Sequence, residues 1–241
     1  MSARICMWSG PRNLSTAMMR SFGSRPDCSV WDEPFFAPFL SVSGKAHPGR
    51  AETLAAHETD PQKVAGACAA PRPSGYFFQK HMPHHMLSGF PMAWARGAKH
   101  FFLIRHPARV IASYAQGRAE FDLSDLGFAA QRSLHAQLTD MTGTPPPIVD
   151  CDDILRGPEQ ALKTLCAALD IPFDASMLSW RSGPRDTDGA WAPYWYASAQ
   201  RSEGFGPAPP HYPPVRPEHD ALYTAALADY NVFYRLRLQS A

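Results

Sequence analysis

The chain is poor in lysine and has almost no net charge. Its 23 basic residues against 22 acidic ones leave a formal net charge of +1. A protein that coats duplex DNA needs a basic excess to neutralise phosphates, so we expect no nucleic-acid partner. Only five of the basic residues are lysines: Lys45, Lys63, Lys80, Lys99 and Lys163. The rest are arginines, whose forked guanidinium suits phosphate oxygens.

Several familiar sequence signals are missing as well. The five cysteines are never spaced as Cys-x-x-Cys, which argues against a zinc ribbon, and their odd number suits a reducing compartment. No apolar run approaches the roughly 20 residues that a membrane span requires, and no secretory leader is recognisable at the N-terminus. We therefore expect a cytoplasmic protein without a membrane span.

Short apolar segments alternate with helical periodicity along the chain. Helices are expected at 14–22 and after Pro107 and Pro158. This alternation predicts an α/β protein with three α/β/α layers and a mostly parallel central sheet. The expected strands are Ile5–Trp8, Cys28–Trp31, Tyr76–Phe78, His100–Ile104 and Ile148–Val149.

The length of 241 residues predicts a single domain covering 1–241. Residues 41–75 lack sustained periodicity and are expected to form an irregular insertion or lid, with a helix near 51–57. An amphipathic helix is expected at 219–238. Proline, at 24 residues, is about twice its usual share of roughly 5%, and four large aromatic residues at 191–196 favour a packed segment over disorder.

The strongest local signal is the turn that follows the first predicted strand. A turn that opens a helix directs free backbone N–H groups, together with the helix dipole, at one point and so favours an anion. Arg12 adds a bidentate donor. The turn consists of Ser9, Gly10, Pro11, Arg12, Asn13, Leu14, Ser15 and Thr16. It lacks the Gly-Lys-[Ser/Thr] ending of a Walker A loop, which argues against an ordinary ATPase or GTPase.

A second signal lies after the fourth predicted strand. Arg105 follows Phe101–Ile104 directly, and Ser113 lies two helical turns beyond Pro107. Ligands of open α/β sheets collect at the carboxyl ends of the strands. This pattern predicts that Arg105 and Ser113 face the same site as the turn at 9–16.

Together these motifs resemble the P-loop sulfotransferase family, in the flavour of its bacterial members. Residues 9–16 look like the family's 5′-phosphosulfate loop, and Arg105 with Ser113 looks like its 3′-phosphate motif. Residues 150–180 are similar to its carboxyl-proximal segment, so the resemblance covers most of 1–180. Leu14 stands where many members have glycine.

The resemblance implies transfer of a sulfuryl group from 3′-phosphoadenylyl sulfate (PAPS) to an acceptor hydroxyl or amine on a small molecule, without a metal. Arg12 and the loop would bind the donor phosphates and stabilise the leaving oxygen. Arg105 and Ser113 would hold the 3′-phosphate. Arg201, in Arg201–Phe205, resembles the basic segment that closes over the adenosine end of the donor.

Two residues compete for the role of the catalytic base. Glu33 follows a strand end in a neighbourhood where some bacterial members use a glutamate. His81 resembles the histidine of the Lys-Thr-His-Leu-Pro stretch in cytosolic members, although here Lys80 adjoins it directly. A neutral histidine suits proton abstraction, whereas a glutamate needs a raised pKa. Lys80 is a candidate to assist at the sulfuryl group.

Other interpretations remain open. A P-loop kinase of a small molecule would need a loop lysine, which is absent, and a carboxylate such as Asp150 or Asp152. A non-catalytic nucleotide-binding module is favoured by Leu14. The cluster of His81, His84 and His85 is interrupted by Met82–Pro83 and lacks a partner motif, so solvated or acceptor-site histidines fit it better than a metal site.

Overall fold

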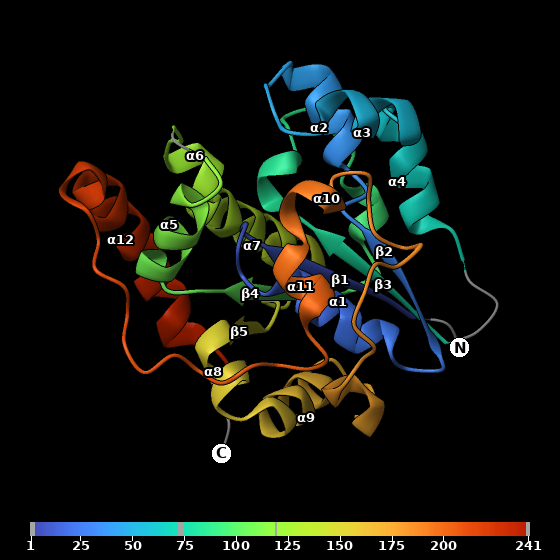
Figure 1. Ribbon diagram of the computed structural model, residues 1–241. Helices are drawn as coiled ribbons and strands as arrows, with labels where there is room; N and C mark the ends of the chain where they lie inside the picture. Colours follow the sequence, from blue (N-terminus) through green and yellow to red (C-terminus); the bar gives the residue numbers. More distant parts are fainter. Residues whose placement is uncertain (1–2, 72–74, 119, 240–241) are drawn as a thin grey trace.

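The computed structural model describes residues 3–71, 75–118 and 120–239. Its centre is a five-stranded sheet in the order β2-β3-β1-β4-β5 (Figure 1). Every neighbouring pair is parallel, so the predicted α/β class with a parallel sheet is confirmed. The strands are β1 (Ala3–Ser9), β2 (Cys28–Asp32), β3 (Tyr76–His81), β4 (Lys99–Ile104) and β5 (Ile148–Asp150).

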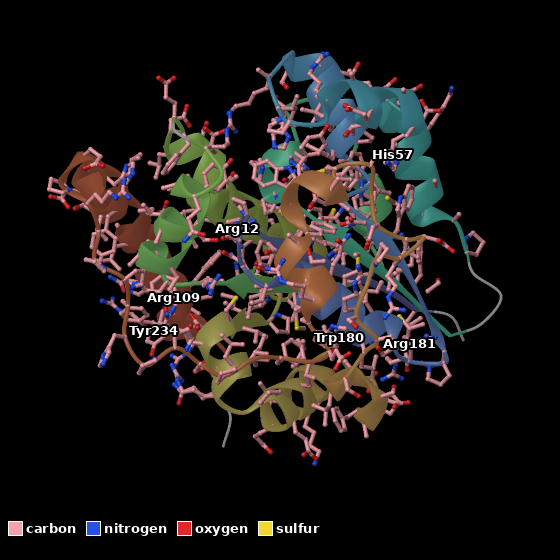
Figure 2. All side chains as sticks on the ribbon, in the orientation of Figure 1. Arg12, His57, Arg109, Trp180, Arg181 and Tyr234 are labelled. Carbon is pink, nitrogen blue, oxygen red and sulfur yellow. The ribbon has the colours of Figure 1, made fainter. Side chains whose placement is uncertain are left out.

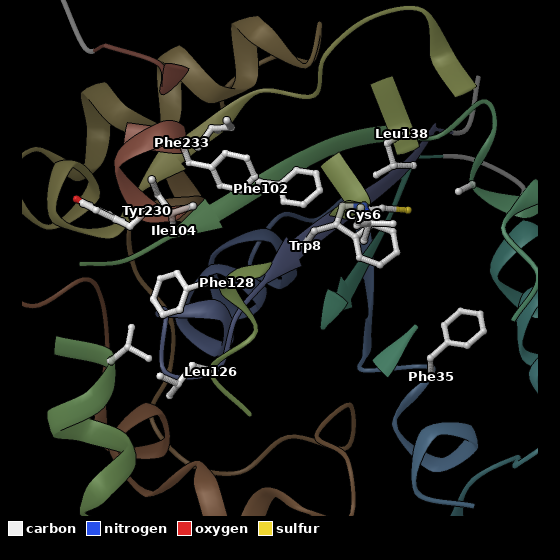
Figure 3. Packing of buried hydrophobic residues seen from close by; sticks show 14 of the residues in the cluster. Cys6, Trp8, Phe35, Phe102, Ile104, Leu126, Phe128, Leu138, Tyr230 and Phe233 are labelled. Atoms are coloured by element: carbon white, nitrogen blue, oxygen red, sulfur yellow. The ribbon is translucent and has the colours of Figure 1, made fainter. Parts of the chain in front are cut away.

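Side chains of a strand point alternately to opposite faces of a sheet. Both faces of this sheet carry apolar side chains, and helices cover both. Cys6 and Trp8 of β1 join one apolar cluster with α4, α5, α7 and α12 (Figure 3). Ile5 and Met7 join a second with α1, α8 and α9. The longer helices are α1 (Ser15–Gly23), α2 (Phe36–Ser43), α4 (Pro61–Ala69), α5 (Pro107–Ala115), α7 (Phe128–Thr142), α9 (Pro158–Ala168) and α12 (Asp220–Leu236). The shorter ones are α3 (Arg50–Ala56), α6 (Leu123–Leu126), α8 (Cys151–Arg156), α10 (Ala192–Trp195) and α11 (Ala197–Arg201).

The segment predicted as an irregular insertion at 41–75 is more regular than its sequence indicates. It contains α3, close to the helix expected at 51–57, and also α4, which the periodicity did not reveal. The Asp60 side chain caps α4 by accepting from the Gln62 N–H at 2.8 Å, and Pro61 fits its first turn. Residues 72–74 of the predicted insertion lie outside the described residues.

The Pro-rich region with its aromatic residues packs against the body of the protein. Residues 189–206, with α10 and α11, cross in front of the sheet (orange in Figure 1). The Gly189 N–H donates to Asp32 of β2 at 3.1 Å. Trp191 and Tyr196 are buried against α2. This segment therefore covers the carboxyl ends of β2 and β3.

A histidine inside the core couples folding to pH. The indole of Trp8 donates to Nδ1 of His100 at 3.1 Å, and His100 Nε2 lies 2.9 Å from the Ala95 carbonyl. Indole is only a donor, so the neutral imidazole with its proton on Nε2 satisfies both partners. Burial lowers the pKa of His100 to about 4.

We expect His100 to make the protein less stable in acid. Because its pKa is lower in the folded state than the ordinary 6.5, its contribution is complete above about pH 6.5 and is lost as the pH falls towards 4, by as much as about 3 kcal/mol. Urea unfolding of wild type and His100→Gln across this range measures it. The variant should lose part of the pH dependence; an unchanged slope would contradict the assignment.

Candidate functional site

A cleft of about 440 Å³ opens at the carboxyl edge of the sheet. It gathers most of the site residues expected from the sequence, Arg12 among them, which Figure 2 labels. The predicted residues that line it are Pro11, Arg12, Asn13, Leu14, Ser15, Thr16, Glu33, Lys80, Arg105 and Ser113. Four predicted residues are not among its lining: Ser9, Gly10, His81 and Arg201.

The loop between β1 and α1 is held in place by contacts with β4 and α8. Asn13 Nδ2 donates to the Leu103 carbonyl at 3.1 Å, and Cys151 Sγ lies 2.9 Å from the Asn13 carbonyl. A Cβ on Gly10 would lie 3.1 Å from the Leu126 carbonyl oxygen, so glycine suits this position. Within the described residues no side chain caps the N-terminus of α1. Its first-turn N–H groups are therefore available to an anion.

Leu14 adopts a backbone conformation that explains why glycine is common at this place in the family it resembles. Its φ is 58° and its ψ 15°, the left-handed region, which costs a non-glycine residue roughly 1–2 kcal/mol. The side chain packs against the apolar cluster around α1. That contact offsets part of the strain.

Two guanidinium groups meet at the loop. Arg105 donates to the Arg12 carbonyl at 2.6 Å, and Arg12 Nε donates to Ser113 Oγ at 2.8 Å. Among the described residues neither arginine pairs with a carboxylate, and Nε of Arg105 is buried without a hydrogen-bond partner. Burial, and then the charge of Arg105, lower the pKa of Arg12. An anion placed here would relieve this repulsion.

A buried cluster of charges lies beside the loop, where β2 and β3 end. Lys80 is 0% exposed; its Nζ donates to Asp32 at 2.8 Å, to Glu33, and to the Tyr196 hydroxyl at 2.7 Å. The Tyr196 hydroxyl in turn donates to Asp32 at 2.8 Å. Burial opposes the charged lysine, but the two carboxylates outweigh it and hold the pKa of Lys80 well above its ordinary value.

Glu33 is the carboxylate of this cluster that reaches the cleft. Its φ of 39° is in the left-handed region, and its N–H donates to the Lys80 carbonyl at 2.9 Å. Burial raises the pKa of Glu33, and the negative charge of Asp32 raises it further against the opposing effect of Lys80. Two carboxylates share one ammonium, so one of them is driven towards protonation. A raised pKa is what a carboxylate base at neutral pH requires.

His81 faces the opposite side of β3 from this cluster. Its ring stacks on Trp8 at 4.6 Å, and its Nε2 lies 3.1 Å from Oε1 of Gln79. Burial lowers the pKa of His81 well below the ordinary value. The structure thus places Lys80 and Glu33 in the cleft and His81 in the adjoining core.

Arg201 ends α11, is exposed and does not line the cleft, whereas residues that follow it do. The residues of that segment that line the cleft are Ser202, Gly204, Phe205 and Gly206.

Tyr196 lines the cleft and was not assigned to the site by the sequence analysis. Tyr196 lies 116 positions from Lys80, and no local pattern links the two. His84 and His85, weighed as solvated or acceptor-site residues, line the cleft, and each has a buried Nδ1 without a hydrogen-bond partner. No three His, Cys, Asp or Glu side chains in the described part of the chain are placed to hold a metal ion.

The chain is similar to two plant proteins, and its described helices show no membrane span. None of the helices in the described ranges combines the length and apolarity needed to cross a bilayer. Two proteins of Arabidopsis thaliana, named branched-chain-amino-acid aminotransferase-like proteins 1 and 2, are 40% identical to the chain over 230 residues. The match covers 95% of this chain and 41% of each relative, so the chain spans about two fifths of their length.

Solved structures of similar fold are sulfotransferases at low sequence identity. The sulfotransferase domain of the Synechococcus PCC 7002 olefin synthase superposes with a TM-score of 0.63 at 18% identity, over 97% of this chain and 94% of that one. A sulfotransferase from Alicyclobacillus acidocaldarius gives 0.53 at 13% identity, over 98% and 97%. These likenesses confirm the fold. A family model described as a sulfotransferase domain matches residues 3–236, and the chain therefore belongs to the sulfotransferase family.

Proposed function

We propose that this domain transfers a sulfuryl group from PAPS to a hydroxyl or amine of a small-molecule acceptor. One observation carries the proposal: Arg12 and Arg105 lie together beside the uncapped start of α1, and neither has a carboxylate partner among the described residues. Cations without counter-ions at a helix N-terminus fit a phosphate-bearing ligand. The family membership supplies the reaction class.

The donor would lie along the cleft with its phosphosulfate at the loop after β1 and its nucleoside beside Ser202–Gly206. Residues 11–17 would take the 5′-phosphosulfate, and Arg105 with Ser113 the 3′-phosphate that distinguishes PAPS from ATP. Leu155 and Ser202–Gly206 line the part of the cleft left for the nucleoside. This arrangement leaves Glu33 and Lys80 for the transfer itself.

The chemistry assigned to these residues is a single displacement at sulfur. Glu33 takes the proton of the acceptor hydroxyl, whose oxygen forms the new S–O bond. The bond from sulfur to the bridging phosphate oxygen breaks, and its electron pair leaves with adenosine 3′,5′-bisphosphate (3′,5′-ADP). Arg12 and the first-turn N–H groups of α1 stabilise the charge that develops on this oxygen. Lys80 holds the Glu33 carboxylate in place through a direct hydrogen bond.

The contacts of Asp150 and Asp152 argue against the small-molecule kinase. Asp150 accepts from the Tyr230 hydroxyl and the Asp152 N–H at 2.8 and 2.7 Å, and Asp152 pairs with Arg109 at 3.1 Å. Neither carboxylate lines the cleft, where a Mg²⁺ on a transferring phosphate would have to be held.

Calorimetric titration with 3′,5′-ADP, 5′-AMP and ATP tests the donor site. We expect the wild type to bind 3′,5′-ADP at least about tenfold more tightly than 5′-AMP, because Arg105 makes charge-assisted hydrogen bonds to the 3′-phosphate. Arg105→Ala should abolish this preference and leave the affinity for 5′-AMP nearly unchanged.

A matched control is Arg132→Ala, which removes an ion pair with Asp229; neither residue lines the cleft. It should bind all three nucleotides as the wild type does. Equal affinity of the wild type for 3′,5′-ADP and 5′-AMP would refute the 3′-phosphate site, and preference for ATP would favour the kinase.

A further inference from the structure

The Glu33 carboxylate uses its two oxygens differently. Oε1 accepts a hydrogen bond from Lys80 and lies 3.4 Å from the Tyr196 hydroxyl, whose proton goes to Asp32. Oε2 has no hydrogen-bond partner among the described residues; it faces Nδ1 of His85 at 3.8 Å. This separation is too long for a direct hydrogen bond. The pair therefore leaves a polar gap at the wall of the cleft.

The imidazole of His85 is held so that only its edge can meet a ligand. Its ring stacks on Phe36 at 4.7 Å and on Phe39 at 4.8 Å, with interplanar angles of 18° and 24°. The residue is 4% exposed, lines the cleft, and its Nδ1 is buried without a hydrogen-bond partner. A buried polar atom without a partner is costly, so this atom marks a place where a ligand group would be stabilised.

We propose that His85 and Glu33 together bind the reacting hydroxyl of the acceptor, and that this pair selects alcohols over protonated amines. The inference rests on the proposed function, because it assigns the acceptor end of the same cleft. An oxygen can lie about 2.8 Å from each of two atoms that are 3.8 Å apart. It then accepts from His85 Nδ1–H and donates its own proton to Glu33 Oε2.

This arrangement needs one lone pair and one proton on the same acceptor atom. A hydroxyl has both, whereas an ammonium group has no lone pair to accept from Nδ1–H. Burial keeps His85 neutral by lowering its pKa well below the ordinary value, and the nearby His84 and His47 lower it further.

The walls around the pair point to a flat, apolar substituent on the alcohol. Phe36 meets His47 edge-on at 4.9 Å and Trp191 edge-on at 5.0 Å, and Trp195 lies 5.3 Å from His47. All of them line the cleft. Rings in this arrangement bury aromatic surface favourably. An arylalkyl alcohol therefore fits better than a sugar or another polyol.

The tautomer of His85 provides a test that does not depend on turnover. In ¹⁵N-labelled protein with 3′,5′-ADP, NMR should show the His85 signal, identified by its loss in His85→Phe, as the tautomer with its proton on Nδ1. The Nε2–H tautomer would overturn the proposal, since a bare Nδ1 facing Glu33 could not donate to the acceptor.

Turnover provides the second test, with 2-phenylethanol and 2-phenylethylamine as matched probes. We expect the wild type to prefer the alcohol at neutral pH. His85→Phe keeps the stacking surface but should lower kcat/KM for the alcohol by about 10- to 100-fold, the worth of one buried hydrogen bond. His85→Gln, which retains an N–H donor, should recover part of it. His135→Phe changes a histidine in α7 outside the cleft and should behave as the wild type.

The outcomes separate this inference from the proposed function. Three results, each obtained with intact 3′,5′-ADP binding, would overturn the role of His85 alone. They are equal use of both probes, no turnover of the alcohol, and a wild-type kcat/KM in His85→Phe. If the wild type does not bind 3′,5′-ADP, the donor site is refuted instead. The tautomer would still decide whether Nδ1 of His85 can donate.

Discussion

Glu33→Gln is expected to lower kcat for sulfuryl transfer by about 10³-fold while leaving the affinity for 3′,5′-ADP within about twofold. The substitution keeps the size of the side chain and an oxygen that can accept from Lys80. It removes the group that takes the acceptor proton. Rapid-quench measurement of labelled sulfate transfer, with calorimetry of 3′,5′-ADP on the same samples, separates chemistry from binding.

The pH dependence of the wild type supplies an independent readout of the same residue. Burial raises the pKa of Glu33 above its ordinary 4.5, so kcat should fall as the pH drops through that raised value, because the protonated acid cannot accept a proton. This acid limb should be absent from the residual activity of Glu33→Gln. A variant that keeps both the rate and the limb would exclude Glu33 as the base.

His81→Phe is the comparison that decides between the two candidates for the base. His81 stacks on Trp8 in the core and is not part of the cleft lining, so phenylalanine preserves the ring contact. With Glu33 as the base, this variant should transfer sulfate at close to the wild-type rate. A loss of about 10³-fold in His81→Phe, with Glu33→Gln active, would reverse the assignment.

The sequence was most informative where the site is local in the chain. The turn at 9–16 and the Arg105–Ser113 pair each follow a strand whose carboxyl end faces the cleft, and parallel pairing brings such ends to one edge. The sequence analysis placed both Lys80 and His81 in the site, although the strand pattern already argued against having both there. Adjacent residues of a strand face opposite sides, so the two could not both enter the cleft as side chains of β3.

The remaining features depend on contacts between distant segments. Tyr196 reaches Asp32 across 164 positions. His85 lies in η1 (Pro83–His85), which packs against α2, and its Nδ1 is 3.8 Å from Glu33 Oε2. No spacing rule connects these residues. The second helix of the 41–75 segment was missed for a related reason: α4 is short and rich in alanine, so its apolar stripe is weak as a pattern and is fixed by packing of Val64 and Cys68 in the core.

The buried ammonium of Lys80 gives the largest expected effect on stability. Lys80→Met should reduce the free energy of unfolding by about 3–5 kcal/mol, because it leaves Asp32 and Glu33 buried without their cation. At about 2–4 °C per kcal/mol for a chain of this size, Tm should fall by roughly 6–20 °C. Urea unfolding and scanning calorimetry at neutral pH measure both quantities.

The same cluster predicts which further substitutions restore the stability of Lys80→Met. In Lys80→Met, the cost arises from two carboxylates left facing each other, so adding Asp32→Asn and Glu33→Gln should recover a substantial part of the loss. Lys163→Met, which breaks an exposed pair with Glu159, should cost under about 0.5 kcal/mol. If Lys80→Met costs no more than Lys163→Met, the two buried carboxylates do not depend on the Lys80 ammonium for their stability, and the expected effect of the charge cluster on folding is refuted.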